Sequence, residues 1–208
     1  MNERAVGITA AIVAGGSSSR FGGIPKGLER VGGKRIVDRV IEAVHAVASD
    51  VFIVSNADDA PHWTANVRVV RDIRGERGSL VGIHTALATS AGPTLVLAWD
   101  MPFVSTDLLR VLVNRSLAER FAVIPESDSG LEPFCALYQR ECLPIIERAI
   151  DERDLRVTAL PSRFPSFTRI PVADVRAIGE PQRLFFNVNL ADDLRRAEEL
   201  ERSANGSR

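Results

Sequence analysis

Several residue types that carry chemistry or cross-links are scarce in this chain of 208 residues. It has two cysteines and three histidines, and its 26 lysines and arginines nearly balance its 27 aspartates and glutamates, for a net charge of −1. This balance excludes an extended nucleic-acid or anionic-membrane surface, so any phosphate binding is expected to be local. Cys135 and Cys142 lack the spacing of a metal site or a disulfide framework. We expect both to be reduced core residues of a cytoplasmic protein.

Long apolar runs are also missing. None approaches the length that spans a bilayer, and the N-terminus lacks the hydrophobic segment of a signal peptide. The length fits a single domain over residues 1–202, and the polar residues 203–208 are expected to form a disordered tail.

Short apolar segments alternate with amphipathic ones through the first half of the chain. They predict strands and helices in turn: strands at 8–13, 51–54, 67–70 and 94–98, and helices at 36–48, 80–89 and 106–118, the last capped by Ser105. This order predicts a doubly wound, mostly parallel α/β sheet with helices on both faces. The second half is less regular. It predicts strands at 121–124, 132–138, 168–172 and 184–189, a turn at 126–130, and helices at 140–150 and from 191 to about 202.

A glycine-rich loop follows the first predicted strand. It reads Val13-Ala-Gly-Gly-Ser-Ser-Ser-Arg-Phe-Gly-Gly-Ile-Pro-Lys26. Glycine lets backbone N–H groups approach a phosphate closely, and Arg20 and Lys26 can neutralise its charge. The spacing fits neither the G-x-G-x-x-G fingerprint nor a P-loop. A flexible surface loop is the alternative, but a strand-anchored loop with two cations favours a clamp for several phosphates.

Polar residues follow the other parallel strands, at the edge where such sheets bind ligands. Asp100 ends the most hydrophobic strand and is well placed to hold Mg²⁺, although an aspartate there can also simply form a turn. Asn56 fits a helix N-cap as well as it fits a ligand contact. Asp72 either joins the site or opens a loop, and Trp99 and His84 are expected to pack in the core.

Two amides near the C-terminus form a further candidate. Asn187 and Asn189 flank Val188, so in a strand their side chains would share one face and could bind a polar ligand. Asn189 with Asp192 also fits a cap for the last helix. The sequence shows no Ser-His-Asp set, Cys-His pair or histidine-rich cluster. These features together predict phosphoryl or nucleotidyl transfer, in which positioning and charge neutralisation do most of the catalysis.

Four segments closely resemble motifs of the molybdenum cofactor guanylyltransferase family. They are the glycine-rich loop, Gly78-Ser-Leu-Val-Gly82 with Ser79 in place of the family's proline, Asp100-Met-Pro-Phe103, and Phe186-Asn-Val-Asn-Leu-Ala-Asp-Asp-Leu194. The matches run from residue 8 to residue 194 in the family's order. The pair Gly15-Gly16, together with the two amides, favours the guanylyl branch over the sibling cytidylyltransferases, which carry Ala-Ala-Gly and aspartates at these places.

The resemblance implies a three-layer, Rossmann-like fold of the nucleotide-diphospho-sugar transferase type. It implies an enzyme that binds GTP and Mg²⁺ and transfers GMP to molybdopterin with release of diphosphate. Residues 1–120 would bind the nucleotide and residues 121–202 the acceptor. The implied nucleotide contacts are Val13, Ala14, Gly15, Gly16, Lys26, Asn56, Asp72, Gly82 and Asp100. Asn187 and Asn189 are the implied acceptor contacts, and Arg20, Lys26 and Asp100 the implied catalytic residues, with Asp100 as the metal ligand.

The same resemblance implies a molybdenum-insertion protein and acceptor molybdoenzymes as partners. Three alternatives stay open on the sequence: a CTP-dependent molybdopterin cytidylyltransferase, a sugar-phosphate nucleotidyltransferase, and, from another class, a non-catalytic GTP-binding regulatory module.

Overall fold

A central, mostly parallel sheet organises the fold. The computed structural model describes residues 7–15 and 25–205. Within them, eight strands form one sheet with the order β10-β7-β9-β6-β1-β4-β5, and β8 pairs with β7. Strand β1 lies parallel to both β4 and β6, whereas β9 is antiparallel to its neighbours β6 and β7. The strands are β1 (Thr9–Val13), β4 (Asp50–Val54), β5 (Arg68–Val70), β6 (Thr94–Ala98), β7 (Ala122–Ser127), β8 (Gly130–Leu131), β9 (Cys135–Tyr138) and β10 (Thr168–Ile170).

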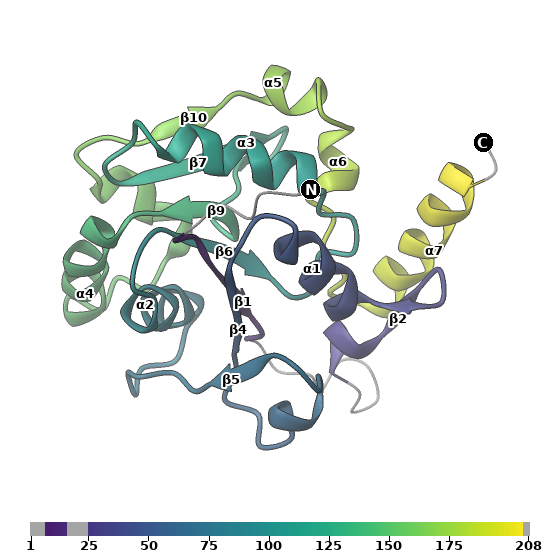
Figure 1. Cartoon of the computed structure of the whole chain (residues 1–208), viewed down its shortest axis with the longest axis horizontal. Helices are drawn as coiled ribbons and strands as arrows, with labels where there is room; N and C mark the ends of the chain where they lie inside the picture. The colour runs from purple at the N-terminus through teal and green to yellow at the C-terminus, as the bar shows by residue number, and fades with distance from the viewer. Residues whose placement is uncertain (1–6, 16–24, 206–208) are drawn as a thin grey trace.

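Helices cover both faces of this sheet, as the alternating pattern predicts (Figure 1). They are α1 (Ile36–His45), α2 (Ser79–Thr89), α3 (Thr106–Ser116), α4 (Leu143–Asp151), α5 (Val172–Arg176), α6 (Pro181–Leu184) and α7 (Ala191–Asn205). The predicted cap of α3 is present, because the side chain of Ser105 accepts a hydrogen bond from Leu108 N at 3.2 Å. None of the helices in the described part of the chain has both the length and the hydropathy needed to cross a bilayer.

The buried strands divide the core into two halves. Ile12 and Leu97 face a hydrophobic cluster shared with α1 and α3, while Ala11 and Val96 face a second cluster shared with α2 and α4. Because side chains alternate along a strand, each central strand contributes to both clusters. The result is the expected three-layer arrangement, in which strand ends are free to carry polar groups.

Several predictions for the second half of the chain are wrong in detail. The predicted strand at 184–189 is absent: Leu184 ends α6, and Val188 N donates to Asp100 O at 2.9 Å, so this segment pairs with the loop after β6 instead. The predicted turn at 126–130 is shorter, since β7 continues to Ser127 and β8 begins at Gly130, whose φ of +119° suits glycine. Strand β9 begins only at Cys135, because Pro133 cannot donate to a sheet ladder.

The ends of two other predicted elements also differ. Strand β10 stops at Ile170 because Pro171 caps α5, so residues 171 and 172 are not in the strand. The predicted tail is partly helical: α7 extends to Asn205, and Ser203 Oγ donates to Glu199 O at 2.9 Å. Residues 206–208 lie outside the described part.

A short hairpin that the sequence analysis missed connects the first half of the chain to its end. Strands β2 (Arg30–Val31) and β3 (Lys34–Arg35) pair across Gly32 and Gly33, which have φ of +58° and +78°. Two consecutive positive φ angles are typical of the tightest hairpin turns.

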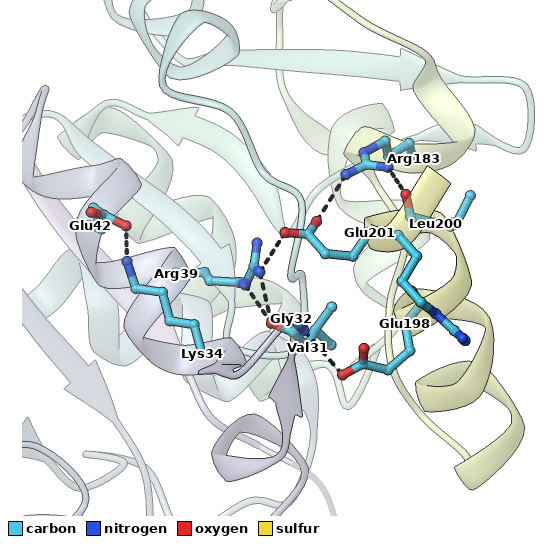
Figure 2. A network of polar contacts seen from close by, with 10 residues as sticks. Val31, Gly32, Lys34, Arg39, Glu42, Arg183, Glu198, Leu200 and Glu201 are labelled. Atoms are coloured by element: carbon cyan, nitrogen blue, oxygen red, sulfur yellow. Dashed lines mark hydrogen bonds and ion pairs between the residues drawn. The ribbon is translucent and has the colours of Figure 1, made fainter. Parts of the chain in front are cut away.

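Helix α7 stands beside this hairpin, away from the main sheet (Figure 1). Figure 2 shows the polar contacts that hold it: Glu201 accepts hydrogen bonds from Arg39 of α1 at 2.8 Å and from Arg183 of α6 at 3.1 Å. Glu198 accepts from Gly32 N at 3.1 Å. Three separate elements therefore fix α7, and with it the segment that carries Asn187 and Asn189.

Candidate active site

A cleft of about 1040 Å³ lies at the carboxyl ends of the parallel strands. Ten of the residues that the sequence analysis predicts for the site line it together: Val13, Ala14, Gly15, Lys26, Asn56, Asp72, Gly82, Asp100, Asn187 and Asn189. The other two, Gly16 and Arg20, lie outside the described residues. The fold therefore brings residues from both ends of the chain to one place, as expected for the open edge of a doubly wound sheet.

Lys26, Asp100 and Asn189 all line this cleft, and Lys26 contacts the other two. Lys26 Nζ donates to Asp100 Oδ2 and to Asn189 Oδ1, the latter at 2.9 Å. The side chains of Lys26 and Asp100 are only 18% and 7% exposed, so this ion pair is largely shielded from water. Each charge offsets the free-energy cost of removing the other from water, because an unpaired buried charge is strongly unfavourable. The pair therefore places one cation and one carboxylate side by side in the cleft.

Asn56 and Asp72 form a second polar pair at the ends of the adjacent strands β4 and β5. Asn56 Nδ2 donates to Asp72 Oδ2 at 2.7 Å, and Asp72 N donates to Asn56 Oδ1 at 2.9 Å. Thr85 of α2 also donates to Asp72 Oδ1, at 3.2 Å. The helix-cap interpretation of Asn56 is wrong, since its side chain faces Asp72 instead. The opposed contacts fix both side chains at the cleft wall.

The loop before α7 is held by its own contacts. Asn187 Nδ2 donates to Phe185 O at 2.9 Å, which fixes the bend of the segment. The predicted cap pair of Asn189 and Asp192 is wrong: Asp193 Oδ2 accepts from the backbone N–H groups of Asn189 and Leu190, at 2.9 and 2.8 Å. The side chain of Asn189 is thus left to contact Lys26.

Two positions of the cleft are occupied by glycine for different physical reasons. A Cβ on the buried Gly82 would lie 2.6 Å from Val13 Cγ1, so glycine there lets α2 pack closely on β1. A Cβ on Gly15 would meet no described atom within 4 Å. Packing within the described protein therefore requires glycine at position 82 but not at position 15. Gly15 instead keeps space open inside the cleft.

A stack of two tryptophan rings, which the sequence did not predict, lies against the turn that carries Lys26. Trp99 is buried, as expected, and stacks on Trp63 with ring centroids 4.7 Å apart. A Cβ on Gly27 would lie 2.3 Å from the Trp99 ring, so the turn that carries Lys26 lies directly on the indole. His84 is also a packing residue, as expected, between α2 and α4. In the sequence, the glycine that directly follows Lys26 is the feature that could have indicated this close approach to the Trp99 ring.

The donors present fit a magnesium-type ion better than a transition metal. Within residues 7–15 and 25–205, no three His, Cys, Asp or Glu side chains form a metal-binding group. Asp100 offers one carboxylate in the cleft, and Mg²⁺ is commonly bound by one or two carboxylates with phosphate oxygens completing its shell. The two cysteines are buried and free, and burial raises the pKa of both thiols, which makes them poor ligands.

The chain is similar to known proteins over nearly its whole length. Residues 10–161 match the family model of the MobA-like NTP transferase domain. A molybdenum cofactor guanylyltransferase from Desulfosudis oleivorans is 33% identical over 92% of this chain and 94% of that protein. The crystal structure of molybdopterin-guanine dinucleotide biosynthesis protein A from Archaeoglobus fulgidus has 28% identity, a TM-score of 0.78 and coverage of 94% and 99% of the two chains.

A more distant structure shares the fold alone. It is a manganese complex of a protein from Mycobacterium tuberculosis H37Rv, with 19% identity, a TM-score of 0.63 and coverage of 94% and 99%. The fold is thus common to proteins of low sequence similarity, whereas the two relatives above share sequence across both halves of the cleft.

Proposed function

The chain belongs to the MobA-like NTP transferase family, and we propose that it is a molybdenum cofactor guanylyltransferase, which transfers GMP from GTP to the terminal phosphate of molybdopterin. The observation that carries this proposal is the cleft, where the predicted nucleotide and acceptor residues meet at the Lys26–Asp100 ion pair. In this proposal molybdopterin and GTP are the substrates. A molybdenum-insertion protein and the acceptor molybdoenzymes are the proposed protein partners, in the cytoplasm.

The proposed reaction is one in-line displacement. An oxygen of the acceptor's terminal phosphate forms a bond to the α-phosphorus of GTP, while the bond from that phosphorus to the β-phosphate oxygen breaks and diphosphate leaves. This oxygen is already ionised at neutral pH, so no side chain has to remove a proton. The work of the protein is to align the two phosphates and to offset their charge.

Described residues are suited to both tasks. Lys26 supplies a positive charge inside the cleft, and its contact with Asn189 links the nucleotide residues to the proposed acceptor residues. The start of α2 also lines the cleft through Gly78 and Ser79, where free backbone N–H groups favour an anion. Asn56 and Asp72 form a polar wall suited to the guanosine.

We assign Asp100 as the protein ligand of a divalent ion, proposed to be Mg²⁺. When bound, such an ion would polarise phosphate oxygens and offset their negative charge. Without substrate, Lys26 balances the carboxylate of Asp100, so neither charge stays unpaired in the cleft.

Gly15→Ala and Gly82→Ala should separate ligand space from protein packing. Gly82→Ala places a methyl against Val13, and we expect it to lower the free energy of unfolding by about 1–3 kcal/mol. Gly15→Ala should leave the Tm unchanged but raise the Kd of GTP by about tenfold or more, because the methyl fills cleft space. Thermal unfolding and GTP titration measure the two effects. An equal loss of stability in both variants would contradict this division of roles.

A thermal-shift comparison of GTP and CTP, each with Mg²⁺, tests the proposed nucleotide. At about 100 times its Kd, GTP adds about 2.7 kcal/mol to stability, which raises the Tm of a chain of this size by about 5–10 °C. CTP at the same concentration should cause a much smaller rise. A larger shift with CTP would favour the cytidylyltransferase alternative, and no shift with either nucleotide would contradict the proposal.

A further inference from the structure

One wall of the cleft comes from the segment that precedes β9. Glu132, Pro133 and Phe134 all line it, just before β9 begins. Because β9 is antiparallel to β6, its start lies at the edge where β6 ends. A hydrogen bond of 2.9 Å from Ala98 N to Phe134 O places the segment directly beside Trp99 and Asp100.

Glu132 is an unusual carboxylate for such a position. Its side chain is half-buried, and no cation of residues 7–15 and 25–205 forms an ion pair with it. Its backbone is fixed, because Glu132 N donates to Pro125 O at 2.9 Å and Cys135 N donates to Glu132 O at 3.0 Å. Burial raises the pKa of the carboxyl, and a hydrogen bond from Ser127 offsets part of that rise. A ligand with N–H groups would offset the cost of this burial.

Phe134 adds an aromatic surface two residues further on. Its ring is half-buried, packs partly on the α2–α4 side of the core, and lines the cleft with Glu132. An aromatic ring binds the face of a planar heterocycle, while a carboxylate accepts hydrogen bonds from amino and imino groups on its edge. The two side chains together suit a flat ring with an N–H edge.

The sheet order separates this wall from the proposed guanosine wall. Strand β5, which ends at Val70 two residues before Asp72, lies three strands from β6 on one side, roughly 14 Å at ordinary strand spacing. Glu132 and Phe134 lie on the other side of β6. The Lys26–Asp100 pair is between the two walls, where the two substrates have to meet.

We propose that Glu132 and Phe134 form the subsite for the pterin ring of the acceptor. Phe134 packs against the face of the ring, and Glu132 accepts hydrogen bonds from the N–H and NH₂ groups of its edge. This assignment rests on the proposed function. Guanine presents a similar N–H edge, so the competing possibility is that Glu132 binds the base of GTP, and the experiment has to separate the two.

The test measures KM for each substrate in Glu132→Gln and Phe134→Leu. Losing a charged hydrogen-bond acceptor should raise KM for molybdopterin by about 10- to 100-fold in Glu132→Gln, with kcat within about threefold of the unsubstituted enzyme. Phe134→Leu should raise it by about tenfold through lost stacking. KM for GTP and the thermal shift with GTP should stay unchanged. Glu126→Gln is the matched control, since Glu126 is a nearby partly buried carboxylate that pairs with Arg169 and does not line the cleft.

Two results would overturn the assignment. One is an acceptor KM within about twofold of the unsubstituted enzyme in Glu132→Gln, and the other is a loss of GTP binding in that variant, which would place Glu132 at the guanine base. A readout independent of turnover is available, because Trp63 and Trp99, the only two tryptophans, line the cleft and their fluorescence can report ligand binding.

That readout separates failure of this assignment from failure of the proposed function. If the unsubstituted protein forms no product but binds molybdopterin, weaker binding by Glu132→Gln still supports the subsite, and equal binding overturns it. If the unsubstituted protein does not bind molybdopterin at all, the subsite is overturned as well.

Discussion

Replacing Asp100 by asparagine is expected to lower the rate of GMP transfer on the order of 10³-fold, because the side chain keeps its shape but loses its charge. The side chain of Asp100 is 7% exposed, lines the cleft and forms an ion pair with Lys26. Asparagine can still accept a hydrogen bond from Lys26, so the fold and much of the GTP binding should persist, although Lys26 loses its counter-charge and the Tm should fall. The loss should therefore appear mainly in kcat, measured as diphosphate release with saturating GTP and molybdopterin.

Asp128→Asn is the matched control for Asp100→Asn. Asp128 is an aspartate on the surface that pairs with Arg176 and does not line the cleft. Its substitution should leave turnover unchanged. A near-normal rate of GMP transfer in Asp100→Asn would contradict the role assigned to this carboxylate as the ligand of the divalent ion.

Replacing Lys26 by methionine should raise the Kd of GTP by roughly 10- to 100-fold, since one charge-assisted contact to phosphate is lost. The same change removes the hydrogen bonds to Asp100 and Asn189. It leaves the carboxylate of Asp100 without its cation, at a cost of about 3–5 kcal/mol for a buried pair. We therefore expect a lower Tm together with the weaker GTP binding, measured by isothermal titration.

Two further variants separate the lysine's charge from its effect on stability. Lys26→Arg keeps a positive charge beside Asp100 and should recover most of the Tm and part of the GTP affinity. Lys34→Met removes the only other lysine of the chain, which is more exposed and pairs with Glu42 away from the cleft. If Lys26→Met bound GTP as tightly as Lys34→Met does, the phosphate role of Lys26 would be wrong.

The parallel half of the sheet is predictable because each strand carries its own signal. Thr94–Ala98 is a short apolar run that ends at a tryptophan and an aspartate, and the structure has β6 at those same bounds. A strand buried on both faces is hydrophobic at nearly every position, so the end of the hydrophobic segment shows where polar side chains begin. This signal identifies Asn56, Asp72 and Asp100, each of which lies two residues beyond the end of its strand.

The second half is less predictable because its contacts are distant in sequence. Phe185, Phe186 and Val188 look like a strand, yet Val188 packs in a small cluster with Val31, Ile36 and Phe103. No local sequence pattern distinguishes a residue that packs in such a cluster from a residue in a β-strand. Similarly, Lys26 meets Asp100 and Asn189 across 74 and 163 residues, so no spacing could have shown their contact. Glu132 was hidden inside a predicted strand, although the following proline argued against that strand.

The most direct test of the proposed activity is the product formed by the purified protein with molybdopterin, Mg²⁺ and either GTP or CTP. GTP and molybdopterin together should yield the guanine dinucleotide and one diphosphate per product, whereas omission of either substrate should give no product and CTP should be a poor donor. GTP binding without diphosphate release would indicate the regulatory module instead. A faster reaction with CTP, or transfer to a sugar phosphate but not to molybdopterin, would contradict the proposed guanylyltransferase activity.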